Sequence, residues 1–249
     1  MAVLICFLGA RVLAGAATSW EAVVGVTEIE DIHSFLGTCP SLRELAILQS
    51  DFPIVLELSL RVQEPIYTCY ELSGAIRTPS DQLAIIQALR VIRHMRLSRP
   101  LPWTDLHPYE WLKSRIGAIA VSDTASFNHC CHTVFPIGKP QGVQAMTLQK
   151  ADDKLLAYRM VWRDPSAGTG MGNLILLILH EARHIDLPHD CDGIDDSSLR
   201  YMGAWGVQIT VAQYLAAGWI DIGLSQQDRQ HLAFLAEDLQ SSRLCDRKD

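Results

Sequence analysis

Residues 174–184 read LILLILHEARH. Residues 174–179 are all apolar, so a helix formed here is apolar on every side and is predicted to be buried in the body of the domain. His180, Glu181 and His184 follow this apolar run directly. Buried polar side chains need partners, and a metal ion would supply them. The alternative is a helix end that faces solvent, on which the histidines have no function.

The spacing of these three polar residues fits a metal site. On a helix, His180 and His184 lie one turn apart on the same face, so both imidazoles can reach one tetrahedral ion. Glu181 is rotated by about 100° from His180, so it is poorly placed as a ligand but can reach a water molecule beside the ion. The pattern therefore predicts a zinc site with Glu181 as a general base.

This H-E-x-x-H sequence resembles the zinc-binding helix of the zincin superfamily of metallopeptidases, over residues 174–192. The resemblance implies that His180 and His184 bind Zn²⁺ and that Glu181 takes a proton from a water molecule at the zinc. It also implies a mixed sheet whose edge strand borders the substrate cleft beside the helix. The sequence departs from the usual pattern at Arg183 and Asp186, which are charged.

A catalytic zinc normally has three protein ligands and one open position, so a third ligand is expected after His184. In the metzincin branch the motif continues to HExxHxxGxxH, or to Asp at the last place, where this chain has Asp190. The glycine of that motif is replaced by Leu187, whereas Pro188 breaks the helix and allows a tight return. We predict His189 as the third ligand because neutral imidazole is the commonest zinc ligand, with Asp190 as the alternative.

The residues around the motif carry further expectations. Asp186 either orients a ligand histidine through its free ring N–H or is a plain carboxylate at the helix end. Cys191 is predicted to form a disulfide that holds the metal loop rather than to bind the metal. Residues 128–132 read NHCCH, and we interpret them as a disulfide-anchored loop rather than a second metal site.

The segment from Ser198 to about Ala217 is predicted to be one helix. Gly203 and Gly206 leave one side of it bare, so we expect close packing against the metal-binding helix. Tyr201 is expected to pack rather than to stabilise an oxyanion. Met202 would lie inside the helix, which disfavours a Met-turn.

The rest of the chain predicts an α+β fold of the zincin type, in which a small mixed sheet packs on the buried HExxH helix and further helices follow. The 78–95 helix has Arg90 and Arg93 on one side, continued by Arg96, and a solvated face is favoured over an anion-binding stripe. Further helices are expected at 41–50 and 225–239, the latter opening with a Ser225–Asp228 capping box, and strands at 56–62, 117–121, 142–148 and 158–162.

Composition excludes several classes of protein. Of 249 residues, 49% are hydrophobic and 20% are charged, which is enough apolar chain for one large domain and argues against disorder. With a formal charge of −7, no general electrostatic attraction to nucleic acid or anionic lipid is expected. No apolar stretch after the first ten residues approaches the roughly 20 residues of a membrane span. We expect a single domain over residues 20–249.

Residues 1–19 resemble a secretory signal peptide, with a short apolar run and small residues at 14–16, although Arg11 interrupts the run. The alternative is a buried amino-terminal strand or helix. Removal of this segment would take Cys6 with it and leave six of the seven cysteines, an even number that allows three disulfides. Adjacent cysteines rarely bond to each other, so a Cys130–Cys131 pair is not expected. The predicted location is therefore secreted or extracytoplasmic.

These observations predict an exported zinc-dependent hydrolase, a metallopeptidase that acts on peptide or protein substrates. The alternative is a secreted binding or structural protein whose metal site is closed by His180, His184, His189 and either Cys191 or Asp190. No nucleic-acid partner and no membrane span of the mature chain are expected, and no feature of the sequence indicates an oligomeric state.

Overall fold

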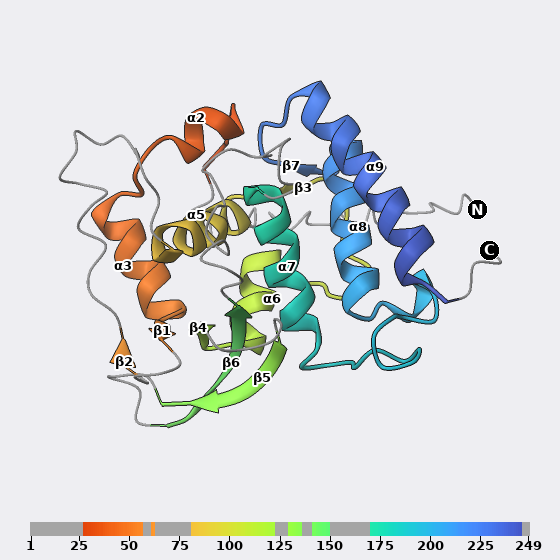
Figure 1. The fold of residues 1–249 in the computed structure, drawn as a ribbon. Coiled ribbons are helices and arrows are strands. Elements are labelled where there is room, and N and C mark those ends of the chain that lie inside the picture. Colours follow the sequence, from red (N-terminus) through yellow and green to blue (C-terminus); the bar gives the residue numbers. More distant parts are fainter. Residues whose placement is uncertain are drawn as a thin grey trace, which may run out of the picture.

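A computed structural model describes residues 27–56, 61–62, 81–122, 129–135, 141–149 and 170–245. These residues form a mixed α+β fold, as predicted. A small sheet lies under helix α7 (Met171–Arg183), α8 (Ala204–Ala217) packs beside α7, and α9 (Gln226–Arg243) packs against α8 (Figure 1). The signal-like residues 1–19 and the predicted strand at 158–162 lie outside the described residues.

The sheet has five strands in the order β2-β1-β4-β6-β5. Strands β1, β4 and β6 run parallel, whereas β2 and β5 are antiparallel to their neighbours and form the two edges of the described sheet. The predicted strands at 117–121 and 142–148 correspond to β4 and β6. The bounds are Ile54–Leu56 for β1, Arg61–Val62 for β2, Ala118–Ser122 for β4, His129–Val134 for β5 and Val143–Gln149 for β6.

Two strand predictions are wrong in detail. The expected strand at 56–62 is an antiparallel pair, because Val55 lies opposite Val62 and the chain reverses between them. Apolar residues can alternate in both strands of an antiparallel pair. The alternation alone therefore does not show where the chain changes direction. Residues 129–134 form a strand rather than a loop, and a register shift between Cys130 and His132 marks a bulge. A bulge adds one residue and so breaks the alternation by which a strand is predicted.

Helix α7 lies at the centre of the core. It contacts α5 (Asp81–Arg93), α6 (Pro108–Arg115), α8 and the edge strand β5. Its apolar residues Leu174, Ile175, Leu176, Ile178 and Leu179 are completely buried, as the run of apolar residues predicts. Each such side chain stabilises the fold by roughly 1.5–3 kcal/mol. The buried end of α7 therefore holds His180 and Glu181 in a fixed position.

Strand β4 shows how the sheet joins this core. Ile119 and Val121 face the helices and belong to the main core, together with Met146 and Leu148 of β6. Ala118 and Ala120 point to the opposite face, where they form a smaller cluster. The alternation along β4 thus sets the face on which α7 packs.

The remaining elements frame this core. Helix α2 covers Ile32–Leu36 and α3 covers Leu42–Asp51, close to the predicted 41–50 helix. Strands β3 (Arg96–Leu97) and β7 (Ile220–Asp221) form a separate antiparallel pair. Helix α9 begins with the predicted capping box, in which Ser225 and Asp228 each accept a hydrogen bond from the other's backbone N–H. No helix in the described ranges is both long enough and apolar enough to span a bilayer.

The predicted helix at 198–217 is interrupted. Leu199–Tyr201 form a short 3-10 turn, Met202 adopts a left-handed conformation with φ of 52°, and α8 begins only at Ala204. The carbonyl of Met202 accepts a hydrogen bond from Arg183 Nε at 2.7 Å, which ties this turn to the end of α7. Met202 therefore lies in a turn. The sequence analysis disfavoured a Met-turn because it placed Met202 inside a helix, and that argument is wrong.

Candidate metal centre

The structure brings together the three histidines predicted as ligands. His180 lies in the last turn of α7, His184 is the C-cap residue with helical φ and ψ, and His189 comes from the loop that follows. One nitrogen of each imidazole lies within 4.8 Å of the others. The ring centroids are separated by 5.1 Å for His180–His184, 5.6 Å for His180–His189 and 4.6 Å for His184–His189. The chain thus turns back after Pro188 as the sequence indicates.

Asp190, the alternative third ligand, has other partners. Its Oδ1 accepts a hydrogen bond from the backbone N–H of Ser197 and its Oδ2 accepts one from the Ser197 hydroxyl, both at 2.6 Å. Both carboxylate oxygens therefore brace the loop between residues 190 and 197. Of the two candidates, only His189 joins the cluster formed by His180 and His184.

A buried carboxylate, which the sequence analysis missed, holds His189. Oδ1 of Asp196 lies 2.9 Å from Nδ1 of His189, and its Oδ2 accepts a hydrogen bond from the backbone N–H of Gly206 at 3.0 Å. Asp196 is 0% exposed. Because Nδ1 of His189 is hydrogen-bonded to Asp196, Nε2 is the nitrogen of His189 that is available to bind a metal. A carboxylate bonded to a ligand histidine is the usual outer-shell partner in zinc sites.

Gly203 provides the space for this carboxylate. A Cβ atom at Gly203 would lie only 2.5–2.6 Å from the carboxylate atoms of Asp196, whereas one at Gly206 would have its nearest neighbour, the carbonyl oxygen of Leu199, at 3.5 Å. The expectation that these glycines allow close packing against the metal-binding helix is wrong for both, because a Cβ at Gly203 would meet Asp196 and one at Gly206 would meet Leu199, Met202 and Asp196, none of which lies on α7. The missing side chain of Gly203 makes room for Asp196.

Trp205 forms an aromatic wall beside the histidines. Its ring centroid lies 4.3 Å from that of His180 in an edge-on arrangement, and 6.0 Å from that of His189 with the planes 20° apart. Its indole N–H donates to the carbonyl of Ile194 at 2.8 Å, which fixes the ring against the loop. Sequence reasoning did not identify Trp205, because nothing in the spacing of residues 199–210 connects it to the histidines.

The environment keeps two of the imidazoles neutral. Burial lowers the pKa of His180 well below its usual value, and the neighbouring His184 and His189 lower it further. Burial, followed by the neighbouring His189, also lowers the pKa of His184. Neutral imidazole is the form that binds metals. Nδ1 of His180 is buried with no hydrogen-bond partner among the described residues, so the cluster fits a bound zinc, which would offset the cost of burying such polar groups.

Glu181 is a buried carboxyl group. Its side chain is only 5% exposed, and burial raises its pKa to about 7. A carboxyl group with a pKa near neutrality can both accept and return a proton under ordinary conditions. This position one residue after His180 is the one that the H-E-x-x-H spacing predicts for a general base.

The two charged residues that depart from the zincin pattern pair with each other. Asp186 accepts hydrogen bonds from Arg115 Nε at 3.0 Å and from Arg183 Nη1 at 2.9 Å. Asp186 therefore braces the end of α7 against α6, which agrees with the alternative of a carboxylate at the helix end rather than one bonded to a histidine. Among the described residues, Asp196 is the carboxylate bonded to His189.

Two contacts anchor the loop that carries His189. Cys191 lies at disulfide distance from Cys245, beyond the end of α9, as the prediction of a disulfide at Cys191 requires. The hydroxyl of Tyr201 donates to the carbonyl of Pro188 at 2.9 Å, so Tyr201 supports the loop. A further pair at disulfide distance, Cys130–Cys131, is one that the sequence analysis did not expect.

Comparison of the chain with protein-family models, with curated proteins and with solved structures found no match. The assignment of a function therefore depends on the residues of the site itself.

Proposed function

We propose that the protein is a zinc-dependent hydrolase that cleaves peptide bonds outside the cytoplasm. The observation that carries the proposal is the convergence of His180, His184 and His189 at the end of α7, the helix that also carries the buried Glu181. When bound, zinc would supply Lewis-acid chemistry, because it lowers the pKa of water and polarises a carbonyl group. The remaining chemistry belongs to the side chains.

Each side chain has a distinct role in this proposal. The three imidazoles would hold the metal in their neutral form, and Asp196 fixes the orientation of His189 through the 2.9 Å contact with Nδ1. Glu181 accepts a proton from the attacking water and passes it to the leaving amine.

A closed, non-catalytic metal site is the less favoured alternative. It would need a fourth protein ligand, for which Cys191 or Asp190 are the candidates. Cys191 is paired with Cys245, and Asp190 binds Ser197 through both oxygens. Three protein ligands leave a position for water and substrate, which is the arrangement of catalytic rather than structural zinc sites.

A peptide is the favoured substrate because of the strand next to α7. Strand β5 is an edge of the described sheet and contacts α7. An extended peptide can add to an edge strand as a further strand. Such a peptide would lie beside the helix that carries Glu181, as the resemblance to zincins implies.

Cysteine pairs at disulfide distance support a location outside the cytoplasm, where disulfides persist. We expect non-reducing mass spectrometry of the purified chain to recover a peptide that links Cys191 to Cys245. A free thiol at both positions would argue for a reducing compartment and against this part of the proposal.

Metal removal tests the proposed activity. The purified chain is expected to contain one zinc per molecule and to cleave members of a mixed peptide library, as detected by mass spectrometry. Chelation should abolish cleavage, and added Zn²⁺ should restore it, because the proposal assigns the activation of water to the metal. Cleavage that persists after complete removal of zinc would contradict the proposal, as would a zinc-loaded chain that cleaves no peptide.

A further inference from the structure

Two polar atoms are buried where α7 packs against α8, and neither has a partner at full hydrogen-bond geometry within the described ranges. They are Nδ1 of His180 and Oε1 of Gln208. Burying a polar atom without a partner is unfavourable. The two atoms are complementary, because a ring nitrogen can carry a proton whereas an amide oxygen only accepts hydrogen bonds.

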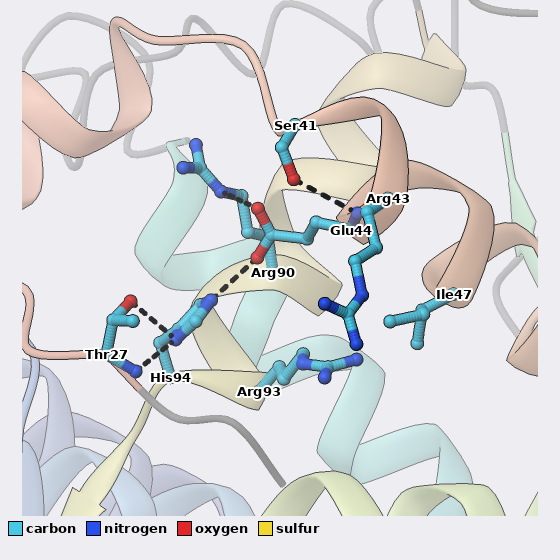
Figure 2. Close-up of a pocket in the computed structure, with 8 residues that line it drawn as sticks. All are labelled: Thr27, Ser41, Arg43, Glu44, Ile47, Arg90, Arg93 and His94. Carbon is cyan, nitrogen blue, oxygen red and sulfur yellow. Dashed lines mark hydrogen bonds and ion pairs between the residues drawn. The ribbon is translucent and has the colours of Figure 1, made fainter.

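The polar residues between α3 and α5 differ from this pair, because they bind one another (Figure 2). Oε2 of Glu44 accepts a hydrogen bond from Nε of Arg90 at 3.0 Å, and Oε1 of Glu44 lies 2.6 Å from Nε2 of His94. Nδ1 of His94 accepts from the backbone N–H of Thr27 at 2.9 Å. Arg90 is 9% exposed, so the interpretation of this residue as part of a solvated helix face is wrong. Both nitrogens of His94 have protein partners, and neither is available to an ion.

His107 is satisfied in the same way. Its Nε2 donates to the carbonyl of Met95 at 2.8 Å, and its Nδ1 accepts from the backbone N–H of Tyr109 at 3.2 Å. Together with His94, it is buried as deeply as His180, which is 4% exposed. Of these three buried histidines, His180 is the one whose Nδ1 lacks a partner in the described part of the chain. A metal at Nε2 of His180 would still leave Nδ1 in need of an acceptor.

Gln208 is placed to supply that acceptor. It follows Trp205 by three residues, so both side chains leave the same face of α8, and the ring centroid of Trp205 lies 4.3 Å from that of His180. Burial lowers the pKa of His180, whereas an interaction with the Gln208 side chain acts in the opposite direction. An interaction that raises the pKa of an imidazole is one in which the ring donates, so the amide oxygen is the partner. The last torsions of both side chains are soft, so a small rotation completes the hydrogen bond.

The other two candidate ligands already have an acceptor of this kind. Nδ1 of His189 lies 2.9 Å from Oδ1 of Asp196. Burial lowers the pKa of His184, and a hydrogen bond with the backbone of Leu187 acts in the opposite direction, so this ring donates to the Leu187 carbonyl. Histidines that bind a metal almost always donate their second N–H to such a partner, which orients the ring. The ring of His180 is the third.

We propose that Gln208 is a positioning residue of the metal centre, whose Oε1 accepts a hydrogen bond from Nδ1–H of His180 and so directs Nε2 of His180 toward the ion. The proposal rests on the proposed function in one respect, namely that zinc occupies the site. Asp196 is then the charged acceptor among the three, whereas the amide of Gln208 orients its ring without adding charge beside the metal.

The tautomer of His180 tests this hydrogen bond without any metal. Long-range ¹H–¹⁵N correlation spectra of the full chain, stripped of metal, distinguish a proton on Nδ1 from one on Nε2. The His180 signals are assigned by their loss in His180→Gln. We expect the wild type to carry the proton on Nδ1. Gln208→Met removes the acceptor at similar side-chain volume and should populate the form protonated at Nε2, whereas Gln208→Glu keeps an acceptor oxygen and should restore the Nδ1–H form.

Zinc affinity tests the consequence for the metal centre. In competition with a chromophoric chelator, Gln208→Met should bind zinc about tenfold more weakly than the wild type, as expected for loss of a residue that orients a metal ligand. Gln208→Glu should bind at least as tightly as the wild type, because a carboxylate accepts more strongly than an amide. Gln213→Met is the matched control, since it makes the same change on α8 at a residue whose amide donates to Gln240 at 3.3 Å. It should bind zinc as the wild type does.

Two results would overturn the role of Gln208. One is a wild-type His180 protonated at Nε2 in the metal-free chain, and the other is equal zinc affinity in Gln208→Met and Gln213→Met. Either result would leave the proposed hydrolase standing. A chain that shows both effects of Gln208 but cleaves no peptide would support this inference and overturn the hydrolase, and a wild type that binds no zinc would overturn both.

Discussion

Replacement of Glu181 by glutamine is expected to reduce kcat for peptide cleavage by about 10²–10⁴-fold, the contribution typical of a general base. Glutamine has nearly the same shape as glutamate but cannot accept the proton of the attacking water. Zinc content should stay at the wild-type level, because the three histidines that gather at the end of α7 do not include Glu181. The measurement compares initial cleavage rates and metal content in the same preparation.

The matched control is Glu237→Gln, an exposed glutamate on α9 that loses the same charge without contact to the metal centre. It should cleave at the wild-type rate. Glu181→Gln should also fold, because the neutral amide removes the cost of burying a carboxylate that is only 5% exposed. Undiminished cleavage by Glu181→Gln would remove Glu181 from the mechanism.

Loss of Asp196 is expected to weaken zinc binding by about 10–100-fold. Asp196→Asn keeps the shape of the side chain but removes the negative charge that orients His189 through the 2.9 Å contact. Zinc affinity is measured by competition with a chromophoric chelator. Affinity equal to that of the wild type would show that His189 does not depend on Asp196.

Two glycine variants test the same contact sterically. Gly203→Ala should weaken zinc binding in the same direction as Asp196→Asn, because its Cβ would lie 2.5–2.6 Å from the Asp196 carboxylate and displace it. The backbone at Gly203 has a φ of −68°, which alanine tolerates, so the effect is steric. Gly206→Ala is the control, since its Cβ would meet nothing closer than 3.5 Å. Equal affinity in both variants would contradict the role of Gly203.

The sequence predicts α7 and its terminal histidines well because the signals are local. A run of six apolar residues defines a buried helix, and a spacing of four residues places His180 and His184 on one face. Such local signals do not decide whether His189 or Asp190 is the third candidate ligand. Their difference depends on Ser197, which binds both oxygens of Asp190 only after the loop has closed.

The parts that the sequence did not predict depend on contacts between distant segments. Asp196 reaches His189 because the loop between them folds back over the start of α8, and no residue pattern marks that path. Trp205 lies against His180 for the same reason. The interruption of the predicted helix at Met202 follows from a left-handed residue stabilised by Arg183, a contact across 19 positions of sequence.

The link between Cys191 and Cys245 joins the loop of His189 to a point 54 residues further along the chain, past both carboxy-terminal helices. In a reducing compartment this covalent connection would open, and the third imidazole would be held by hydrogen bonds alone. In the exported hydrolase proposed above, the active form of the site would then arise only with oxidation. A protease matured in this order would spare the proteins of the cell that makes it.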